Sequence, residues 1–317
     1  MHGRVMLAAG CLMLLAVVWP NAGAGEADEP DTRPVENGAV VSQALPGLAT
    51  GALTHAVLVD LPDDIIVLSG ELMVSKTELE GNLSSTPILQ RLQRIDYAFT
   101  VVEKLVERAL LLREARQAQQ ATGEEPQLDG DALLPWFLDK IAGEPPVGDE
   151  EIREFYDQNK RILGVPDFEE VKNLIEAQLR DEKRRAVVRE HVRTLGLRSE
   201  ILLSEPWAKD QARVMIMSAV DKARWNGHKP TVVAFSSPAC CIDPTRDAMA
   251  AIAENLKGEA SVVHVNASED VMLAERYDIS SLPTLIFFDS EGNEIYRQSG
   301  QMGRIQVINK LKGIPRE

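Results

Sequence analysis

An apolar run that leads into two adjacent cysteines is the feature of this sequence that most limits its fold. Residues 231–235, Thr-Val-Val-Ala-Phe, have the composition of a buried strand, and Cys240 and Cys241 follow within a few residues. The pattern of residues 243–256 then predicts a helix. The two thiols are therefore placed at the start of a helix, where a free cysteine can take part in chemistry.

A proline begins the second half of the same pattern. Pro283 directly precedes an apolar run that ends at Phe288, and a sheet tolerates proline only at an edge, at a strand start or at a bulge. After residue 206 the sequence predicts helices at 212–225, 243–256, 272–277 and 305–311 and strands at 231–235, 262–265, 285–288 and 295–297. This order, together with the cysteine segment and the Leu-Pro-Thr motif, resembles the thioredoxin superfamily. The resemblance implies an α/β thioredoxin fold for residues 206–317.

The resemblance also implies roles for the cysteine segment. Cys240 matches the nucleophile of the family's Cys-x-x-Cys motif, Cys241 takes the first intervening position, and Asp243 stands where the resolving cysteine is expected. The degenerate motif Cys-Cys-Ile-Asp lacks the standard dithiol cycle, and a bond between neighbouring cysteines is strained because their Cα atoms are only about 3.8 Å apart. Asp243 opposes thiolate formation, and Ala234 and Ala239 replace the family's buried acid and tryptophan. A reactive Cys240 and a redox-silent pair both stay open.

The residues around Pro283 are the predicted peptide-binding part of the site. In the family a cis-proline occupies this position and its neighbouring backbone pairs with a bound peptide, so the resemblance assigns binding roles to Leu282, Pro283 and Thr284. The alternative is that Pro283 only maintains the fold.

The region before residue 206 has helical periodicity. Helical patterns cover 89–119, 133–141, 147–160 and a stretch from 166 onward, and Ser75 with Glu78 fits a capping box after a short strand near residue 65. Four segments, at 70–79, 103–115, 149–156 and 168–172, resemble the chaperone domain of the SurA family of periplasmic parvulin-type proteins.

That resemblance implies an all-α-rich, client-binding domain over residues 57–205. In the SurA family an isomerase domain of about a hundred residues usually separates the last two segments, whereas here only residues 161–166 do. No prolyl isomerase activity is therefore expected. A generic helical spacer domain has the same periodicity and stays open as an alternative.

The first 24 residues have the pattern of a secretory signal peptide. Arg4 precedes an apolar stretch over 5–18, and Ala-Gly-Ala at 22–24 offers small residues for cleavage. The stretch is too short to span a membrane comfortably, so no stable membrane insertion is expected after cleavage, and the predicted location is the periplasm. Residues 25–56 are rich in Gly, Ala, Pro, Asp and Glu and are predicted to form a disordered acidic leader.

Export would place the chain in an oxidising compartment, where cysteines tend to be paired or catalytic. Because Cys11 lies in the predicted signal peptide, only Cys240 and Cys241 remain. Two cysteines make no disulfide framework, and with five scattered histidines they argue against a structural zinc site. No metal and no cofactor are expected.

The charge argues against nucleic acid as a partner. The chain has 34 Lys and Arg against 49 Asp and Glu, a net charge of −15, and only 5% aromatic residues. The basic run at 180–189 is interpreted as a solvated helix face, and His191, His228 and His264 as solvated or packed side chains.

The sequence leads to a hypothesis with two alternatives. The leading hypothesis is an exported folding factor that binds unfolded or assembling envelope proteins and engages their thiols or disulfides through Cys240. The first alternative is a non-catalytic docking protein with a redox-silent thioredoxin fold. The second is a thiol-disulfide oxidoreductase whose helical domain dimerises it. A thiol-disulfide exchange partner belongs to the leading hypothesis and to the second alternative, and a homo-oligomeric state stays open.

Overall fold

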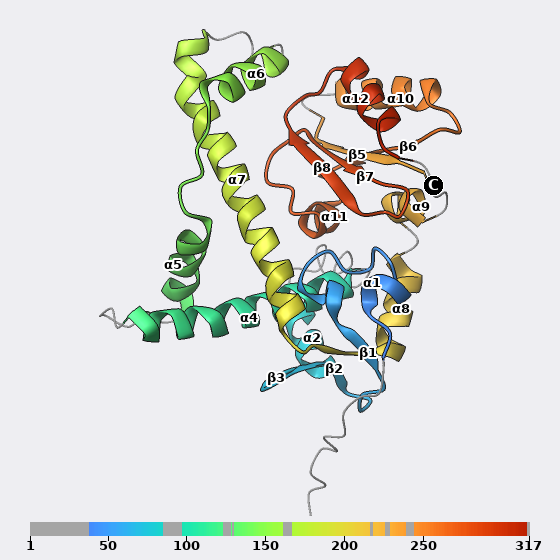
Figure 1. Ribbon diagram of the computed structural model, residues 1–317. Coiled ribbons are helices and arrows are strands. Elements are labelled where there is room, and N and C mark those ends of the chain that lie inside the picture. The colour runs from blue at the N-terminus through green and yellow to red at the C-terminus, as the bar shows by residue number, and fades with distance from the viewer. Residues whose placement is uncertain are drawn as a thin grey trace, which may run out of the picture. The chain divides into compact units, whose positions relative to one another are not determined.

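Two four-stranded sheets organise the part of the chain that the structure describes, one built from residues 57–75 and 202–204 and the other from residues 231–299 (Figure 1). The structure is a computed structural model and describes residues 38–84, 97–122, 128, 130–160, 167–215, 218–225, 229–238 and 244–315. The predicted signal peptide lies outside these residues.

The first sheet has the order β1-β4-β2-β3. Its strands are β1 (Val57–Val59), β2 (Ile65–Ser69), β3 (Leu72–Ser75) and β4 (Leu202–Ser204). β4 pairs parallel with β1 and antiparallel with β2, so the two ends of the helical region meet in this sheet. The sequence analysis predicts one short strand near residue 65 before the capping box at Ser75 and misses β3. Val74 is buried and Met73 is 53% exposed, which is the alternation of a strand, and Gly70 at φ +60° closes a two-residue hairpin loop.

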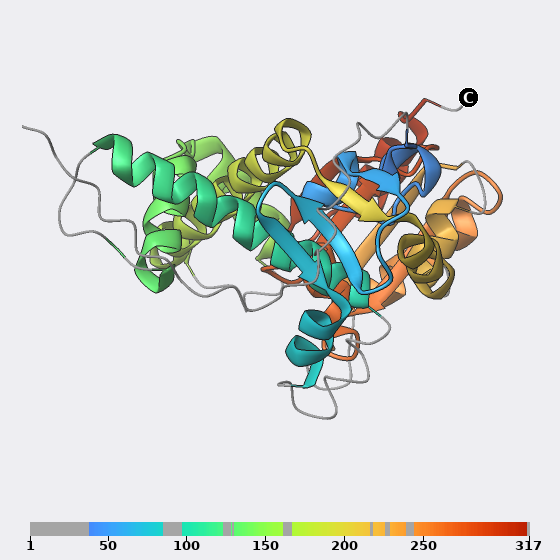
Figure 2. The same ribbon diagram turned by 90° about the horizontal axis from the view of Figure 1, so that it is seen from below.

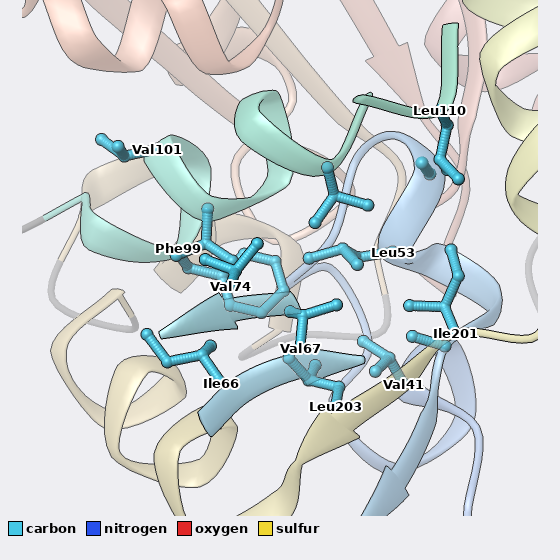
Figure 3. Close-up of a cluster of buried hydrophobic side chains, with 14 of the residues drawn as sticks. Val41, Leu53, Ile66, Val67, Val74, Phe99, Val101, Leu110, Ile201 and Leu203 are labelled. Atoms are coloured by element: carbon cyan, nitrogen blue, oxygen red, sulfur yellow. The ribbon is translucent and has the colours of Figure 1, made fainter. Parts of the chain in front are cut away.

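Residues 38–56 are folded, which corrects the prediction of a disordered leader for this part of the chain. They include α1 (Val41–Ala44) and the 3-10 helix η1 (Ala52–His55). Val41 and Leu53 have no exposed surface and pack in one cluster with Ile66 and Leu203 of the first sheet (Figure 3). The apolar residues of this segment follow no single period, because a short helix, a loop and a 3-10 turn each bury a different face. Residues 25–37 lie outside the described part.

The helical region matches the predicted helices. It contains α2 (Lys76–Ser84), α4 (Ala98–Thr122), α5 (Gly130–Ala142), α6 (Asp149–Asn159) and the long α7 (Phe168–Arg198). Both α5 and α6 contact α7 (Figures 1 and 2). The backbone N–H of Glu78 donates to Ser75 Oγ over 3.0 Å, which confirms one half of the predicted capping box. None of the helices in the described residues is long and apolar enough to cross a membrane.

The second sheet has the order β6-β5-β7-β8, with β5 parallel to β6 and antiparallel to β7, and β7 antiparallel to β8. Its region comprises α8 (Glu205–Met215), α9 (Ala219–Trp225), β5 (Thr231–Ser236), α10 (Pro244–Asn255), β6 (Ser261–Asn266), α11 (Val271–Arg276), β7 (Thr284–Phe288), β8 (Glu294–Ser299) and α12 (Arg304–Lys312). The predicted helix over 212–225 belongs to two helices, α8 and α9. One face of the sheet packs against α10 and α12 and the other against α9 and α11. Both faces are therefore covered, which explains why all six residues of β5 are buried.

A buried arginine joins the second-sheet region to the segment before β1. Arg276 Nη1 lies 3.1 Å from Asp221 Oδ2, and both side chains are essentially inaccessible to solvent. Arg276 Nη2 donates to the backbone carbonyls of Gly47 and Leu48, and Thr50 Oγ1 donates to the carbonyl of Arg276 over 3.2 Å. Because Gly47, Leu48 and Thr50 precede β1, these bonds hold the folded leader against α11.

Candidate functional site

The predicted catalytic residues Cys240 and Cys241 and the modulating residue Asp243 lie outside the described residues, so the site is built from its flanks. β5 ends shortly before this segment and α10 begins directly after it. In the sheet, Thr284 at the start of β7 is the register partner of Phe235 near the end of β5. The sheet therefore places the start of β7 beside the strand from which the cysteine segment continues.

The loop before β7 contains the three predicted binding residues. The Leu282–Pro283 peptide bond is cis, and the Pro283 carbonyl accepts the N–H of Gly300 over 2.7 Å. Thr284 is buried and its Oγ1 donates to the Ser281 carbonyl over 2.7 Å, so this side chain fixes the loop. Leu282 is 45% exposed. Of the three, Leu282 is the most exposed, Pro283 is partly exposed and Thr284 is buried.

A serine–histidine contact lies close to the cysteine segment. Ser236 Oγ and His264 Nε2 are 2.8 Å apart, and Ser236 is the last residue of β5. His264 faces Ala234 in the parallel β5–β6 register. The sequence interpretation of His264 as an unspecific packed or solvated residue misses this contact, because only the register of β5 against β6 brings it to Ser236.

A cavity of about 540 Å³, which we call the edge cleft, lies between the α6–α7 pair and the second sheet. Its walls include Phe155 and Gln158 of α6, Leu179 and Glu182 of α7, Thr284, and residues 294–299 of β8. β8 is the outer strand of the sheet, with no strand on its other side in the part of the chain that the structure describes. The cleft thus runs from the loop that contains Pro283 along a free sheet edge.

Side-chain contacts bridge the edge cleft at one end. Gln298 Nε2 donates to Gln158 Oε1 over 2.7 Å, and the backbone N–H of Gln301 donates to Asn159 Oδ1 over 2.7 Å. Ser281 Oγ donates to Glu182 Oε1 over 3.2 Å, which ties the loop before Pro283 to α7. These contacts set the position of α6 and α7 relative to the predicted binding loop.

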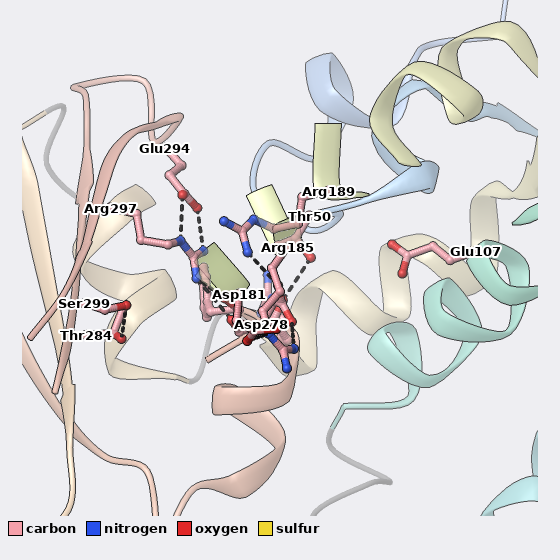
Figure 4. A network of polar contacts seen from close by, with 12 residues as sticks. Thr50, Glu107, Asp181, Arg185, Arg189, Asp278, Thr284, Glu294, Arg297 and Ser299 are labelled. Atoms are coloured by element: carbon pink, nitrogen blue, oxygen red, sulfur yellow. Dashed lines mark hydrogen bonds and ion pairs between the residues drawn. The ribbon is translucent and has the colours of Figure 1, made fainter. Parts of the chain in front are cut away.

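Ion pairs line the cleft where α7 meets the second-sheet region (Figure 4). Arg189 Nη1 donates to Asp278 Oδ2 over 2.7 Å, and Arg297 binds both carboxylate oxygens of Glu294 at 2.9 Å. Burial alone would raise the pKa of Glu294, but the hydrogen bonds and charge of Arg297 outweigh it and hold that pKa below its ordinary value. The basic run at 180–189 is therefore only partly a solvated face, because Arg185 and Arg189 turn toward Asp278.

No group of His, Cys, Asp and Glu that could hold a metal ion occurs among the described residues. His191 instead pairs with Glu114 over 2.7 Å.

Comparison with known proteins places the second-sheet region in a family. Residues 216–313 match the family model of the thioredoxin-like domain. Protein disulfide isomerase-like 1-4 from Oryza sativa subsp. japonica is 31% identical over 84 residues, which is 25% of this chain and 15% of the rice protein. The chain thus spans about a seventh of the length of that curated relative.

Three solved structures are similar to part of this chain. They are chloroplastic thioredoxin z and the exposed lipoprotein thioredoxin of Streptococcus pneumoniae, each 18% identical, and a thioredoxin-like protein from Clostridium perfringens, 22% identical. They cover 29%, 30% and 28% of this chain and 84%, 90% and 72% of their own chains, with TM-scores of 0.26, 0.26 and 0.23. The matching family model, together with the β6-β5-β7-β8 order, shows that this chain carries a C-terminal thioredoxin-like domain over residues 216–313.

Proposed function

We propose that the protein is an exported, periplasmic folding factor that holds an extended segment of an unfolded envelope protein in the edge cleft and engages its thiols or disulfides through Cys240. The observation that carries the proposal is the position of the cleft. It begins at Thr284, the register partner of Phe235, and Cys240 follows Phe235 by five residues in the sequence. A chain bound along the cleft would therefore reach the strand end that leads to the cysteines.

The edge cleft has the properties that an extended chain requires. The outer edge of β8 offers backbone N–H and C=O groups to an added strand, a common mode of peptide recognition. Phe155, Leu179 and the 48% exposed Ile295 supply apolar contacts in or beside it. The helical region provides one wall, in agreement with the client-binding role that the SurA resemblance implies.

Thiol-disulfide exchange is the chemistry proposed for Cys240. Its thiolate would attack one sulfur of a client disulfide, form a mixed disulfide and release the other client cysteine as a thiolate. Cys241, or a small thiol from the surroundings, would then attack the mixed disulfide. Attack on the Cys240 sulfur releases the client cysteine as a thiolate and leaves Cys240 bonded to the attacking sulfur, whereas attack on the client sulfur releases Cys240 as a thiolate and leaves the client bonded to the attacking sulfur. The match to a part of a protein disulfide isomerase-like protein supports this proposal.

The first experiment tests client binding. Delay of aggregation of chemically denatured citrate synthase by the full chain is measured for the wild type, Leu179→Glu and Leu174→Glu. Leu179 lines the cleft, whereas Leu174 lies on the same helix and is 68% exposed outside it, so it is a matched control. The proposal requires that Leu179→Glu weakens protection and that Leu174→Glu does not. Equal protection by both variants would contradict a client site in the cleft.

The second experiment tests the thiol chemistry. Turnover of a peptide disulfide and trapping of a mixed disulfide are compared for the wild type, Cys240→Ser and Cys241→Ser. Loss of both activities only in Cys240→Ser supports the proposed nucleophile. The replacement of the expected resolving cysteine by Asp243 favours a second candidate function, a non-catalytic docking protein. That second function would be established if the wild type shows no disulfide turnover and the Cys240→Ser, Cys241→Ser double variant still protects the client fully from aggregation.

A further inference from the structure

A second cavity, of about 960 Å³, shares the Arg189–Asp278 pair with the edge cleft. We call it the arginine cavity. It is lined by one face of α7, by the segment around residues 46–54, by the C-terminal part of α5 and by the β7–β8 turn at residues 290–293. Its size is that of a small-molecule site. The proposed thiol chemistry does not use it.

The described lining of the arginine cavity carries more positive than negative charge, although the whole chain has a net charge of −15. Eight of these residues are Lys or Arg and five are Asp or Glu. Four carboxylates are already paired: Glu107 with Lys104, Asp181 with Arg185, Asp278 with Arg189, and Glu294 with Arg297. The fifth, Glu291, accepts from Asn293 Nδ2. Three of the remaining cations pair with carboxylates outside the lining, namely Arg184 with Asp139, Arg193 with Glu190 and Arg276 with Asp221. Arg224 is the lining cation that has no carboxylate partner among the described residues.

Arg224 is the most unusual of these cations. It is only 8% exposed, and each of its hydrogen bonds in the described part of the chain goes to a neutral group. Nε and Nη2 donate to the Gly292 carbonyl, and Nη1 donates to the Tyr277 hydroxyl over 2.7 Å. Its guanidinium also lies 4.4 Å from the ring centroid of Phe288. No carboxylate of the described residues forms an ion pair with it, which is rare for a buried arginine because an unpaired buried charge is costly.

The same side chain still has donors to offer. A guanidinium has five N–H groups, and the three hydrogen bonds leave two of them without an acceptor among the described residues. The contacts with Gly292, Tyr277 and Phe288 fix the plane of the group, so little side-chain freedom would be lost on binding an anion. An anion at this place would accept these two N–H groups and form the ion pair that Arg224 lacks among the described residues.

Aliphatic side chains form part of the remaining wall of the cavity. They are Leu111 of α4, Leu138 of α5, and Val188 and Val192 of α7. The combination of one uncompensated arginine with an aliphatic wall suits a single carboxylate carried on an apolar body.

We infer that the arginine cavity binds a monocarboxylate with an apolar body, its carboxylate on Arg224 and its aliphatic part against Val188 and Val192. Two sources share this chemistry, the C-terminus of an apolar peptide and a fatty acid. The inference is independent of the proposed thiol chemistry, since Cys240 takes no part in it.

Isothermal titration calorimetry on the full chain tests the inference. The probes are acetyl-Ala-Val-Leu-Phe as the free acid and as the C-terminal amide, and laurate with dodecanol as its neutral counterpart. At least one acid is expected to bind about tenfold or more tightly than its neutral counterpart, because charge-assisted hydrogen bonds to arginine are strong. Preference for the peptide acid or for laurate identifies the source. Absence of saturable binding by both acids, or equal affinity of each acid and its neutral counterpart, overturns the inference.

Variants locate the binding. Arg224→Gln is expected to abolish the preference for the acid, whereas Arg213→Gln, an arginine of α8 with a 77% exposed side chain, leaves it unchanged. Val188→Glu places a negative charge in the partly exposed cavity wall and is expected to weaken acid binding at least tenfold, which tests the site even if Arg224→Gln does not fold. Retained acid preference in both Arg224→Gln and Val188→Glu would overturn the assignment. Unchanged binding by the Cys240→Ser, Cys241→Ser variant is expected whatever the outcome for the proposed thiol chemistry.

Discussion

The buried pair of Arg276 and Asp221 gives the sharpest test of how this chain is stabilised. Replacing Arg276 by Met removes the 3.1 Å ion pair and the hydrogen bonds to the carbonyls of Gly47 and Leu48, and leaves the fully buried Asp221 without its counter-charge. Breaking a buried pair in this way costs about 3–5 kcal/mol. For a domain of this size that corresponds to a fall of roughly 6–10 °C in Tm.

Urea unfolding followed by circular dichroism, with the matching thermal scan, measures this change. Arg213→Met is the control because it removes an exposed arginine. Its free energy of unfolding is expected to stay within about 0.5 kcal/mol of the wild-type value. Within the described part of the chain, Arg276 Nε and Asp221 Oδ1 have no hydrogen-bond partner, so the pair is incompletely satisfied. The double variant Arg276→Met, Asp221→Leu should therefore be more stable than Arg276→Met alone, because it no longer buries an uncompensated carboxylate.

Two results would refute this reasoning. One is a decrease of less than about 1 kcal/mol in the free energy of unfolding of Arg276→Met, which would mean that the buried pair contributes no more than an exposed ion pair. The other is a double variant less stable than the single one, which would mean that the cost comes from lost packing rather than from the orphaned charge of Asp221.

Three further predictions concern single positions. Gly300→Ala should lower the free energy of unfolding by about 1–3 kcal/mol in urea titrations, because φ is +84° and the added Cβ would lie 2.6 Å from Asn159 Nδ2; an unchanged midpoint would contradict it. Because the pKa of Glu294 is lowered in the folded protein by Arg297, the pair stabilises the fold at neutral pH, and this contribution is lost as the pH falls below about 4.3, the value in an unfolded chain. Stability measured from pH 7 to pH 3 should thus fall less steeply in Glu294→Gln than in the wild type, and parallel curves would disprove this. Ser75→Ala should cost about 0.5–2 kcal/mol in the same urea assay, since its Oγ accepts a backbone N–H at the start of α2, whereas Ser75→Thr should cost less.

Local patterns in the sequence predict much of the thioredoxin-like domain. Runs and periods of apolar residues predict the strands at 231–236, 261–266 and 284–288 and the helices that follow them, because these elements are buried on one or both faces. A proline before an apolar run predicts a strand start, and β7 begins directly after Pro283. The long helices α4 and α7 are predicted for the same reason. By contrast, β3 and β4 are too short to show a period that distinguishes them from a turn or a helix end.

The order of strands and helices from β5 to α12 follows from the sequence, because runs and periods of apolar residues encode each of these elements locally. Whether residues 38–56 fold, and where the edge cleft and the arginine cavity lie, depends on tertiary packing. The contact between Arg276 and Gly47 joins positions 229 residues apart. The sequence around either residue does not predict this contact, because it depends on how two regions pack and not on any period along the chain.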